Sequence, residues 1–517
     1  MKTKINHILP VLLLTAASGL TTVSCNDFLD KTPDNRTELN TDQKIAKLLV
    51  SAYPDVSPNE LFELYSDNSD DSGPTYGYYQ LSEKECYNWE DTKEEYQDTP
   101  NSLWGGYYGA ISAANMALKA IEEKGNPASL NPQRGEALVC RAYCHFMLAT
   151  IFCNAYDTHA SESLGIPYME DVETTVSPRY ERGTLEEVYR KVERDLLEGV
   201  ELISDDGYSV PKYHFTRKAA YAFAARFYLY YMKPDFSNCD RVIDFATRVL
   251  GTNPADLLRN WEALGNLSVN GNVQADAYIA SSNEANLLIS STISNWGAIG
   301  SDYLIGPRYF HNQTLATSET CLSSGLWGSS DYFYLKPFST NGFVASILRK
   351  SGLYEGTYLY YMPVLFSTDE TLLCRAEAYA LKKMYSQSAA DITSWQRAYT
   401  RNKSVLTPEQ INTYYDRMSF YTPFTQQTPK KKLAPDFMIE EGMQENFIHC
   451  ILHIRRITTL HEGMRWPDIK RYGILIYRRD MANQRVTDEM PPNDLRYAIQ
   501  IPRSVIVAGI QPNPRRN

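Results

Sequence analysis

The chain has 517 residues, enough for a large core in one extended helical domain or in two or three domains. Its formal charge of −11 argues against a nucleic-acid partner, because binding to phosphates requires clustered lysines and arginines. After Leu20 no apolar run is long enough to span a bilayer.

The amino end is typical of an exported protein. Lys2 and Lys4 precede an apolar run from Ile8 to Leu20 that is too short for a stable transmembrane helix. Residues 1–24 are therefore predicted to be a signal peptide.

Cys25 stands where this apolar run gives way to a polar, acid-bearing stretch. The two residues before it fit a lipobox, in which the cysteine thiol takes a diacylglycerol, although Thr22 stands where leucine is preferred. Ordinary cleavage after the small residues 16–18 is the alternative, and it would leave Cys25 as a plain thiol. We favour lipidation of Cys25, since no other stretch could hold the chain at a membrane.

Helical periodicity begins at Ser102. In "SLWGGYYGAISAANMALKAIEE" large apolar residues recur every three or four positions, and Asn126-Pro127 ends the pattern. A second helical run, "NPQRGEALVCRAYCHFMLATIFCNAY", follows at once. The sequence predicts two antiparallel helices joined by a short turn.

Similar helical runs recur at residues 183–203, 215–232 and 367–383. Aligning "ALVCRAYCHF", "AYAFAARFYL" and "TLLCRAEAYA" places Leu138, Tyr221 and Leu372 together, followed four residues later by Ala142, Ala225 and Ala376. An alanine one turn after a large residue lets a neighbouring helix approach closely while the gap is filled. We therefore predict degenerate tetratricopeptide-like helix pairs.

Two stretches lack this periodicity, residues 66–100 and a longer one from Gly251 to about Ser367. Both are rich in aromatic and short polar residues, and the whole chain has 38 Tyr, 18 Phe and 7 Trp. Long irregular segments usually carry function, and tyrosine offers apolar area and a hydroxyl with few rotors to freeze. The two stretches are predicted to form a binding surface.

The acids Asp67, Asp70 and Asp71 invite comparison with a calcium loop. With Asn68 at position one, Tyr79 occupies position twelve, where an EF-hand needs a bidentate glutamate. The stretch fails as an EF-hand. A solvated polar loop, or hydrogen bonding to a ligand, is preferred over a looser calcium site.

Three other patterns are interpreted as structural. Glu445, His449 and His453 could present metal ligands on one helix face, but ordinary partly buried histidines are favoured and no metal is expected. The triplet 430–432 of lysines is predicted to be a solvated loop. Cysteines 140, 144 and 153 lie in one helical run without a CxxC pair, so they are predicted to be small core residues.

A glycoside hydrolase is the competing class of function, because acids and aromatics also describe a cleft with two carboxylates. The chain contains no G-x-S-x-G, no P-loop and no recognisable Cys-His signature. Binding without catalysis and without a cofactor is therefore favoured.

Five motifs, in order along the chain, resemble those of one family. "CNDFLDKTPDN" resembles its C-x-D-F-L-D-x-x-P opening, "WGGYYGAISAANMAL" its W-x-x-Y-x-x-I-x-x-A-N helix, and "GEALVCRAYCHFMLATIFCNAY" its repeat helix. "RRITTLHEGMRWPDIKRYG" is close to E-G-x-R-W-x-D-L-x-R-W/Y-G, and "YAIQIPRSVIVAGIQPNP" resembles the Y…I-P…N-P closure. The chain thus resembles the RagB/SusD-type nutrient-binding outer-membrane lipoproteins of the Bacteroidetes.

The fourth motif consists here of Glu462, Arg465, Trp466, Asp468 and Arg471. Its charges alternate at helical spacing, which predicts a structural ion-pair network joining helix to helix. The family often has glutamates where this chain has Ile454 and Thr458, and often ends in N-P-G-Y where this one has "NPRRN".

The resemblance implies a mostly α, SusD-like fold in which tetratricopeptide-like helix pairs form a scaffold and long irregular loops bind the ligand. It divides the chain into a signal peptide (1–24), a tether and ligand-loop segment (25–100), a helical scaffold (101–255), a loop-rich insertion (256–366) and C-terminal helices (367–517).

The resemblance also implies a surface lipoprotein of the outer membrane, anchored through Cys25, that binds an oligosaccharide and delivers it to a SusC-like TonB-dependent transporter without breaking a bond. A RagB-like peptide binder is the alternative, and a surface glycoside hydrolase is a distant third.

A glycan groove needs aromatic rings that stack on sugars beside polar groups that bond hydroxyls. On that reasoning the predicted contacts are Tyr76, Tyr78, Tyr79 and Trp89 from the first irregular stretch, Trp296, Tyr303, Trp327 and Tyr332 from the second, and Asp70 as a hydroxyl acceptor.

Overall fold

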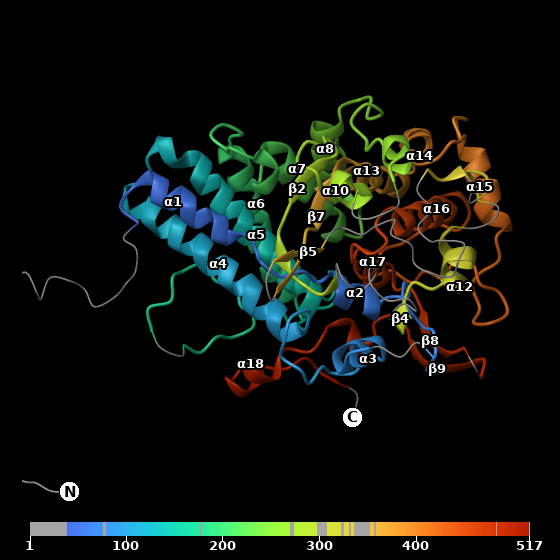
Figure 1. The fold of residues 1–517 in the computed structure, drawn as a ribbon, viewed down its shortest axis with the longest axis horizontal. Coiled ribbons are helices and arrows are strands. Elements are labelled where there is room, and N and C mark those ends of the chain that lie inside the picture. Colours follow the sequence, from blue (N-terminus) through green and yellow to red (C-terminus); the bar gives the residue numbers. More distant parts are fainter. Residues whose placement is uncertain are drawn as a thin grey trace, which may run out of the picture. The chain divides into compact units, whose positions relative to one another are not determined.

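The structure is a computed structural model that describes residues 39–75, 79–175, 178–268, 273–296, 308–321, 325–329, 332–334, 352–355, 358–481 and 483–515. Asn40–Asn517 form one compact unit, built mainly of helices (Figure 1). The predicted signal peptide and Cys25, Tyr76, Tyr78 and Tyr303 lie outside the described residues.

Helices occur along the whole described chain. They are α1 (Asp42–Leu49), α2 (Asn59–Tyr65), α3 (Leu81–Tyr87), α4 (Pro100–Glu123), α5 (Asn131–Phe152), α6 (Leu185–Leu202), α7 (Arg217–Tyr230), α8 (Ser237–Leu250), α9 (Trp261–Gly265), α10 (Val273–Ile279), α12 (Gln313–Leu315), α13 (Thr368–Leu381), α14 (Tyr385–Tyr399), α15 (Pro408–Arg417), α16 (Met443–Thr458), α17 (Arg465–Tyr472) and α18 (Arg503–Val507). Among these described helices, none is long and apolar enough to cross a bilayer.

The strands are short and pair antiparallel. They are β1 (Asp70–Asp71), β2 (Asn286–Ile289), β3 (Thr292–Ile293), β4 (Tyr309–Phe310), β5 (Gly352–Glu355), β6 (Tyr358–Tyr361), β7 (Val364–Ser367), β8 (Ile476–Asp480) and β9 (Arg485–Met490). Their orders are β1-β4, β2-β7, β3-β6-β5 and β8-β9.

The predicted helix pairs form the scaffold. Helix α4 packs along α5, α5 along α6, and α7 along α8, while α13 contacts both α8 and α14 (Figure 1). The aligned Ala142, Ala225 and Ala376 are all fully buried, as close helix contacts require. The mostly helical, repeat-based fold predicted from the sequence is confirmed.

Helices α5 and α6 approach each other through glycine. A Cβ at Gly135 would lie 2.7 Å from the backbone nitrogen of Ile203, and a Cβ at Gly199 would lie 2.9 Å from the carbonyl oxygen of Gly135.

The start of α6 is fixed by a capping box, in which Thr184 Oγ1 accepts from the Glu187 backbone N–H and Glu187 Oε2 accepts from the Thr184 backbone N–H.

The three helix-borne cysteines 140, 144 and 153 are buried and unpaired, as predicted. His449 and His453 are almost completely buried. His453 bonds Tyr415 Oη and the carbonyl of Thr320, both at 2.9 Å. Among the described residues, no group of three side chains is placed to hold a metal ion.

Candidate functional site

The two irregular stretches of the sequence meet in a two-stranded ladder. Strand β1 pairs with β4, so that Asp70 lies opposite Phe310 and Asp71 opposite Tyr309. The backbone N–H of Ser72 extends the ladder by donating to the carbonyl of Arg308 at 2.9 Å. Residues more than two hundred positions apart therefore share one surface.

A second junction holds the same two stretches together near Trp296. Gln97 Nε2 donates to Asn295 Oδ1 at 2.6 Å, and the Asn295 backbone N–H donates to Asp98 Oδ2 at 2.7 Å. Trp296 is partly exposed, and its Nε1 donates to the carbonyl of His461 at 2.9 Å. This indole is thus held in one orientation beside the junction.

Five residues around the β1-β4 ladder form a group that we call the aromatic shelf: Asp71, Tyr79, Tyr87, Arg308 and Tyr309. Tyr309 stacks on Tyr87 with ring centroids 4.6 Å apart and meets the edge of Tyr79 at 5.6 Å. The Arg308 guanidinium lies 5.2 Å from the ring centroids of both Tyr79 and Tyr309. The Tyr79 side chain is 37% exposed, whereas Tyr87 and Tyr309 are buried supports.

Arg308 and Asp71 are joined by two hydrogen bonds. Arg308 Nε donates to Asp71 Oδ1 at 2.7 Å and Nη2 donates to Oδ2 at 2.8 Å. Hydrogen bonding to Asp71 is the main cause of a raised pKa for Arg308, so the guanidinium remains charged. Both side chains are partly exposed, which leaves polar edges beside the Tyr79 ring.

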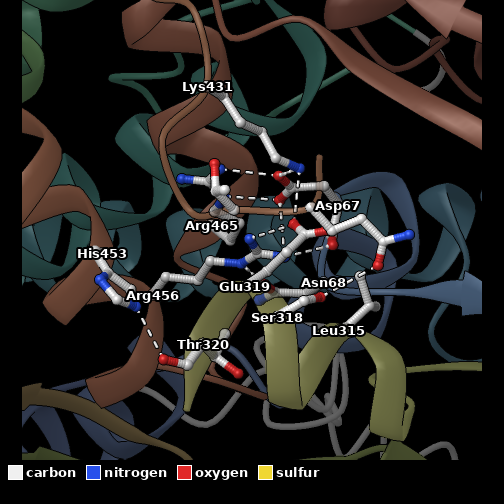
Figure 2. Close-up of polar contacts among 12 residues, drawn as sticks. Asp67, Asn68, Leu315, Ser318, Glu319, Thr320, Lys431, His453, Arg456 and Arg465 are labelled. Carbon is white, nitrogen blue, oxygen red and sulfur yellow. Dashed lines mark hydrogen bonds and ion pairs between the residues drawn. The ribbon is translucent and has the colours of Figure 1, made fainter. Parts of the chain in front are cut away.

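A buried ionic cluster begins at Asp67, three residues before β1. Its members are Asp67, Glu319, Lys431, Arg456 and Arg465 (Figure 2). Asp67 accepts from Arg465 Nε at 2.7 Å and from Lys431 Nζ at 2.6 Å. Glu319 accepts from Arg456 Nη1 at 2.9 Å and lies 2.9 Å from Lys431 Nζ. The cluster links the start of β1 to the π-helical turn Ala316–Thr320, to α16 and to α17.

Two sequence predictions are wrong at this cluster. The acids at 67 and 70 do not lie in a solvated loop, and lysines 430 and 431 are buried as well. Burial opposes the ionisation of Asp67, but the charges of Arg456, Arg465 and Lys431 outweigh it and hold its pKa well below the ordinary value. Because these charges compensate that of Asp67, this carboxylate is buried and still ionised.

Three of the predicted contact residues are buried within the protein. Asp70 is buried and paired with Arg479. Trp89 is buried beneath Arg478, whose guanidinium lies 4.1 Å from its ring, and its Nε1 donates to Tyr65 at 2.8 Å. The Trp327 side chain is 1% exposed and packs on Trp395 and His453. These three side chains are therefore part of the protein interior.

Of the predicted contacts that the structure describes, Tyr79, Trp296 and Tyr332 retain exposed area, and Tyr332 is 44% exposed. Sequence reasoning missed Arg308 and Tyr309. Their only signal is the "PRYF" run in the second irregular stretch, because a two-residue strand has no periodicity of its own.

The charges of the C-terminal signature form the predicted ion-pair network. Asp468 lies 2.7 Å from Arg471 and 3.5 Å from Arg455, and Arg471 lies 2.9 Å from Glu377 in α13. Arg465 pairs with Asp67, while Glu462 accepts from Tyr278 Oη at 2.5 Å and Trp466 is fully buried. At the departures from the family, Ile454 is buried, and Thr458 Oγ1 accepts from Trp395 Nε1 at 2.8 Å.

Comparison with known proteins agrees with this architecture. A SusD-like family model, described as starch-binding and associating with the outer membrane, matches residues 27–229. Among curated proteins, none matches the chain. This match covers the N-terminal helices of the scaffold and agrees with the SusD-like resemblance seen in the sequence.

Solved structures share the fold over nearly the whole chain. A SusD superfamily protein from Bacteroides vulgatus is 18% identical, with a TM-score of 0.60 and coverage of 92% of this chain and 98% of the other. A putative sugar binding protein from the same species is 19% identical, with a TM-score of 0.62 and coverage of 92% and 99%. A SusD superfamily protein from Bacteroides thetaiotaomicron is 18% identical, with a TM-score of 0.58 and coverage of 91% and 98%.

Proposed function

We propose that the protein binds an oligosaccharide nutrient at the cell surface and delivers it to a SusC-like TonB-dependent transporter in the outer membrane. In this proposal a lipid on Cys25 anchors the body. The observation that most supports this proposal is the β1-β4 ladder, which combines Tyr79, Arg308 and Asp71 from two distant stretches into one partly exposed surface. The family description and the sugar-binding name of one structural relative support the same class of ligand.

The aromatic shelf has the chemistry that a sugar requires. The exposed face of Tyr79 can stack on the apolar face of a sugar ring. Asp71 uses its oxygens to accept from Arg308 but keeps lone pairs for hydroxyl donors, and Arg308 keeps N–H groups for hydroxyl acceptors. Because the opposite charges of Arg308 and Asp71 compensate each other, the shelf favours neutral hydroxyl-rich ligands over strongly charged ones.

The same geometry favours binding over hydrolysis. A glycosidase needs two carboxyl groups flanking the scissile bond, one of them protonated to act as the acid. Both carboxylate oxygens of Asp71 accept hydrogen bonds from Arg308, and Asp70 is buried against Arg479. We therefore propose that no bond is broken at this site.

A binding panel tests this proposal. Protein beginning just after Cys25 is titrated with soluble polysaccharides, their oligosaccharides and mixed peptides, using affinity electrophoresis and calorimetry, and every glycan is checked for released reducing ends. The proposal expects saturable binding of at least one neutral glycan without new reducing ends. Binding of peptides alone would favour the RagB-like alternative, and release of reducing ends would favour a hydrolase.

A further inference from the structure

A separate cavity is lined by residues of α4, of the chain that connects α5 to α6, and of α18. Figure 1 shows α4, α5, α6 and α18. Its volume is about 480 Å³, within the range of small-molecule sites. Trp104 and Tyr108 of α4, Tyr180 of the connection and Val505 of α18 are among its lining residues. No residue of the aromatic shelf is among the described residues that line it.

The floor of this cavity is aromatic, and two of its polar side chains, Tyr108 and Asn115, are engaged by the protein. Tyr108 Oη donates to the carbonyl of Pro167 at 2.7 Å. Asn115 donates to the carbonyl of Met169 at 3.0 Å and accepts from Arg141 at 3.0 Å. Since these groups have protein partners, the floor offers a ligand ring surface and few hydrogen bonds.

The Trp104 ring is a fixed part of this floor. It lies 4.9 Å from the Tyr108 ring and 5.1 Å from the Phe152 ring, and it is partly exposed. Two neighbouring rings thus hold the indole in place while part of it remains accessible. A rigid aromatic surface of this kind binds a flat apolar body with little loss of side-chain freedom.

The rim of the cavity is acidic. Asp171 and Glu173 line it and are exposed, and Glu173 accepts a hydrogen bond from Tyr180. The described lining includes no lysine or arginine. The nearby Lys191 and Arg194 instead pair with Glu170. Two carboxylates therefore lie beside the aromatic rings, where they can attract a cation. The positive charge of Arg182, which is not among the described lining residues, also acts on Tyr108.

We propose that this cavity binds a small molecule that carries a protonated amine on an aromatic or apolar body. The rings provide apolar contact and attract a cation through their faces, and the two carboxylates attract the same charge. An anionic ligand of equal shape is repelled by the rim. A neutral sugar finds few free hydrogen-bonding groups on the floor.

Tryptamine is a suitable probe, with 3-indolepropionate as its anionic partner of similar ring and size. Calorimetric titration of the mature chain should give saturable tryptamine binding, and at least tenfold weaker binding of 3-indolepropionate. No saturation by tryptamine up to 5 mM, or equal affinities for the two probes, overturns the proposal.

Three variants assign the binding to this cavity. Ser112→Trp, at an exposed lining position of α4, should fill the cavity and lower tryptamine affinity at least tenfold. The double change Asp171→Asn with Glu173→Gln should lower it at least threefold. Glu122→Gln, on an exposed position of the same helix, should leave it unchanged. Unaltered tryptamine affinity in Ser112→Trp, with an unchanged melting temperature, contradicts the assignment. Because the aromatic shelf does not line this cavity, glycan binding should be the same in all these variants.

Discussion

Two groups of buried carboxylates behave differently because their neighbours differ. Asp67 and Glu319 face three cations, and their pKa values are lowered despite burial. For Glu83 and Asp98, no neighbouring cation contributes to the change in pKa. Burial is the main reason that their pKa values rise, to about 7 for Glu83 and about 6 for Asp98. The first group stabilises the fold when ionised, and the second when protonated.

This contrast gives a prediction for Glu83→Gln. Because the folded pKa of Glu83 is above its ordinary value of 4.5, the carboxyl destabilises the fold progressively as pH rises from about 4.5 through 7. The variant should therefore have a higher free energy of unfolding than the wild type at pH 8. At pH 4.5 this advantage should be absent. Urea titrations at both pH values measure it, and an equal effect at the two would contradict the account.

At the scale of elements, close helix approach depends on glycine. Gly135→Ala should destabilise the protein by about 1–3 kcal/mol, because its Cβ would meet the backbone of α6 and its following residue at 2.7–2.9 Å. Gly109→Ala is the matched control on α4, where nothing lies within 4 Å of the new Cβ. It should stabilise by about 0.5–1 kcal/mol through helix propensity. Thermal unfolding that ranks the two variants in the opposite order would refute this.

The long scaffold helices could be predicted from the sequence to within a few residues, whereas α3, α9 and α10 lie in the stretches without helical periodicity. The run from 183 to 203 became α6 (Leu185–Leu202), since periodicity and caps are local signals. The β1-β4 ladder could not be predicted, because two residues carry no pattern and their partners are distant in sequence. Lys431 was misplaced for the same reason. Its partner Asp67 is 364 residues away, and composition alone assigns both to solvent.

Contacts between distant parts of the chain also limited how much of the candidate site could be predicted from the sequence. Aromatic loops were recognisable from composition, and Tyr79 is indeed partly exposed. Composition cannot distinguish a ligand-facing ring from a buried one such as Trp327. Nor does it show that Arg308 completes the aromatic shelf, because that depends on the pairing of distant strands.

At the scale of the whole molecule, the two halves of the chain depend on each other. Arg465 and Arg456 of the C-terminal helices bond Asp67 and Asn68, and Arg478 donates to the carbonyl of Leu64 at 2.6 Å. Removing such partners leaves buried charges without compensation. The compact unit from Asn40 to Asn517 is therefore expected to fold as one body.

A fragment of residues 40–255 tests this dependence. It should show no cooperative thermal transition, because Asp67 loses Arg456, Arg465 and Lys431 together. The chain 40–517 is the control and should unfold cooperatively. A cooperative transition in the shorter fragment would show that the scaffold is independent.

Binding of an oligosaccharide to the aromatic shelf is tested most directly by the glycan affinity of Tyr79→Ala. The comparison uses the glycan identified by the panel and Tyr213→Ala as control, because the exposed fractions of Tyr79 and Tyr213 are 37% and 38%. Loss of a stacked ring at a binding site costs on the order of 2 kcal/mol. Calorimetry should therefore show affinity at least tenfold weaker for Tyr79→Ala and unchanged for Tyr213→Ala. Wild-type affinity in Tyr79→Ala would contradict the account.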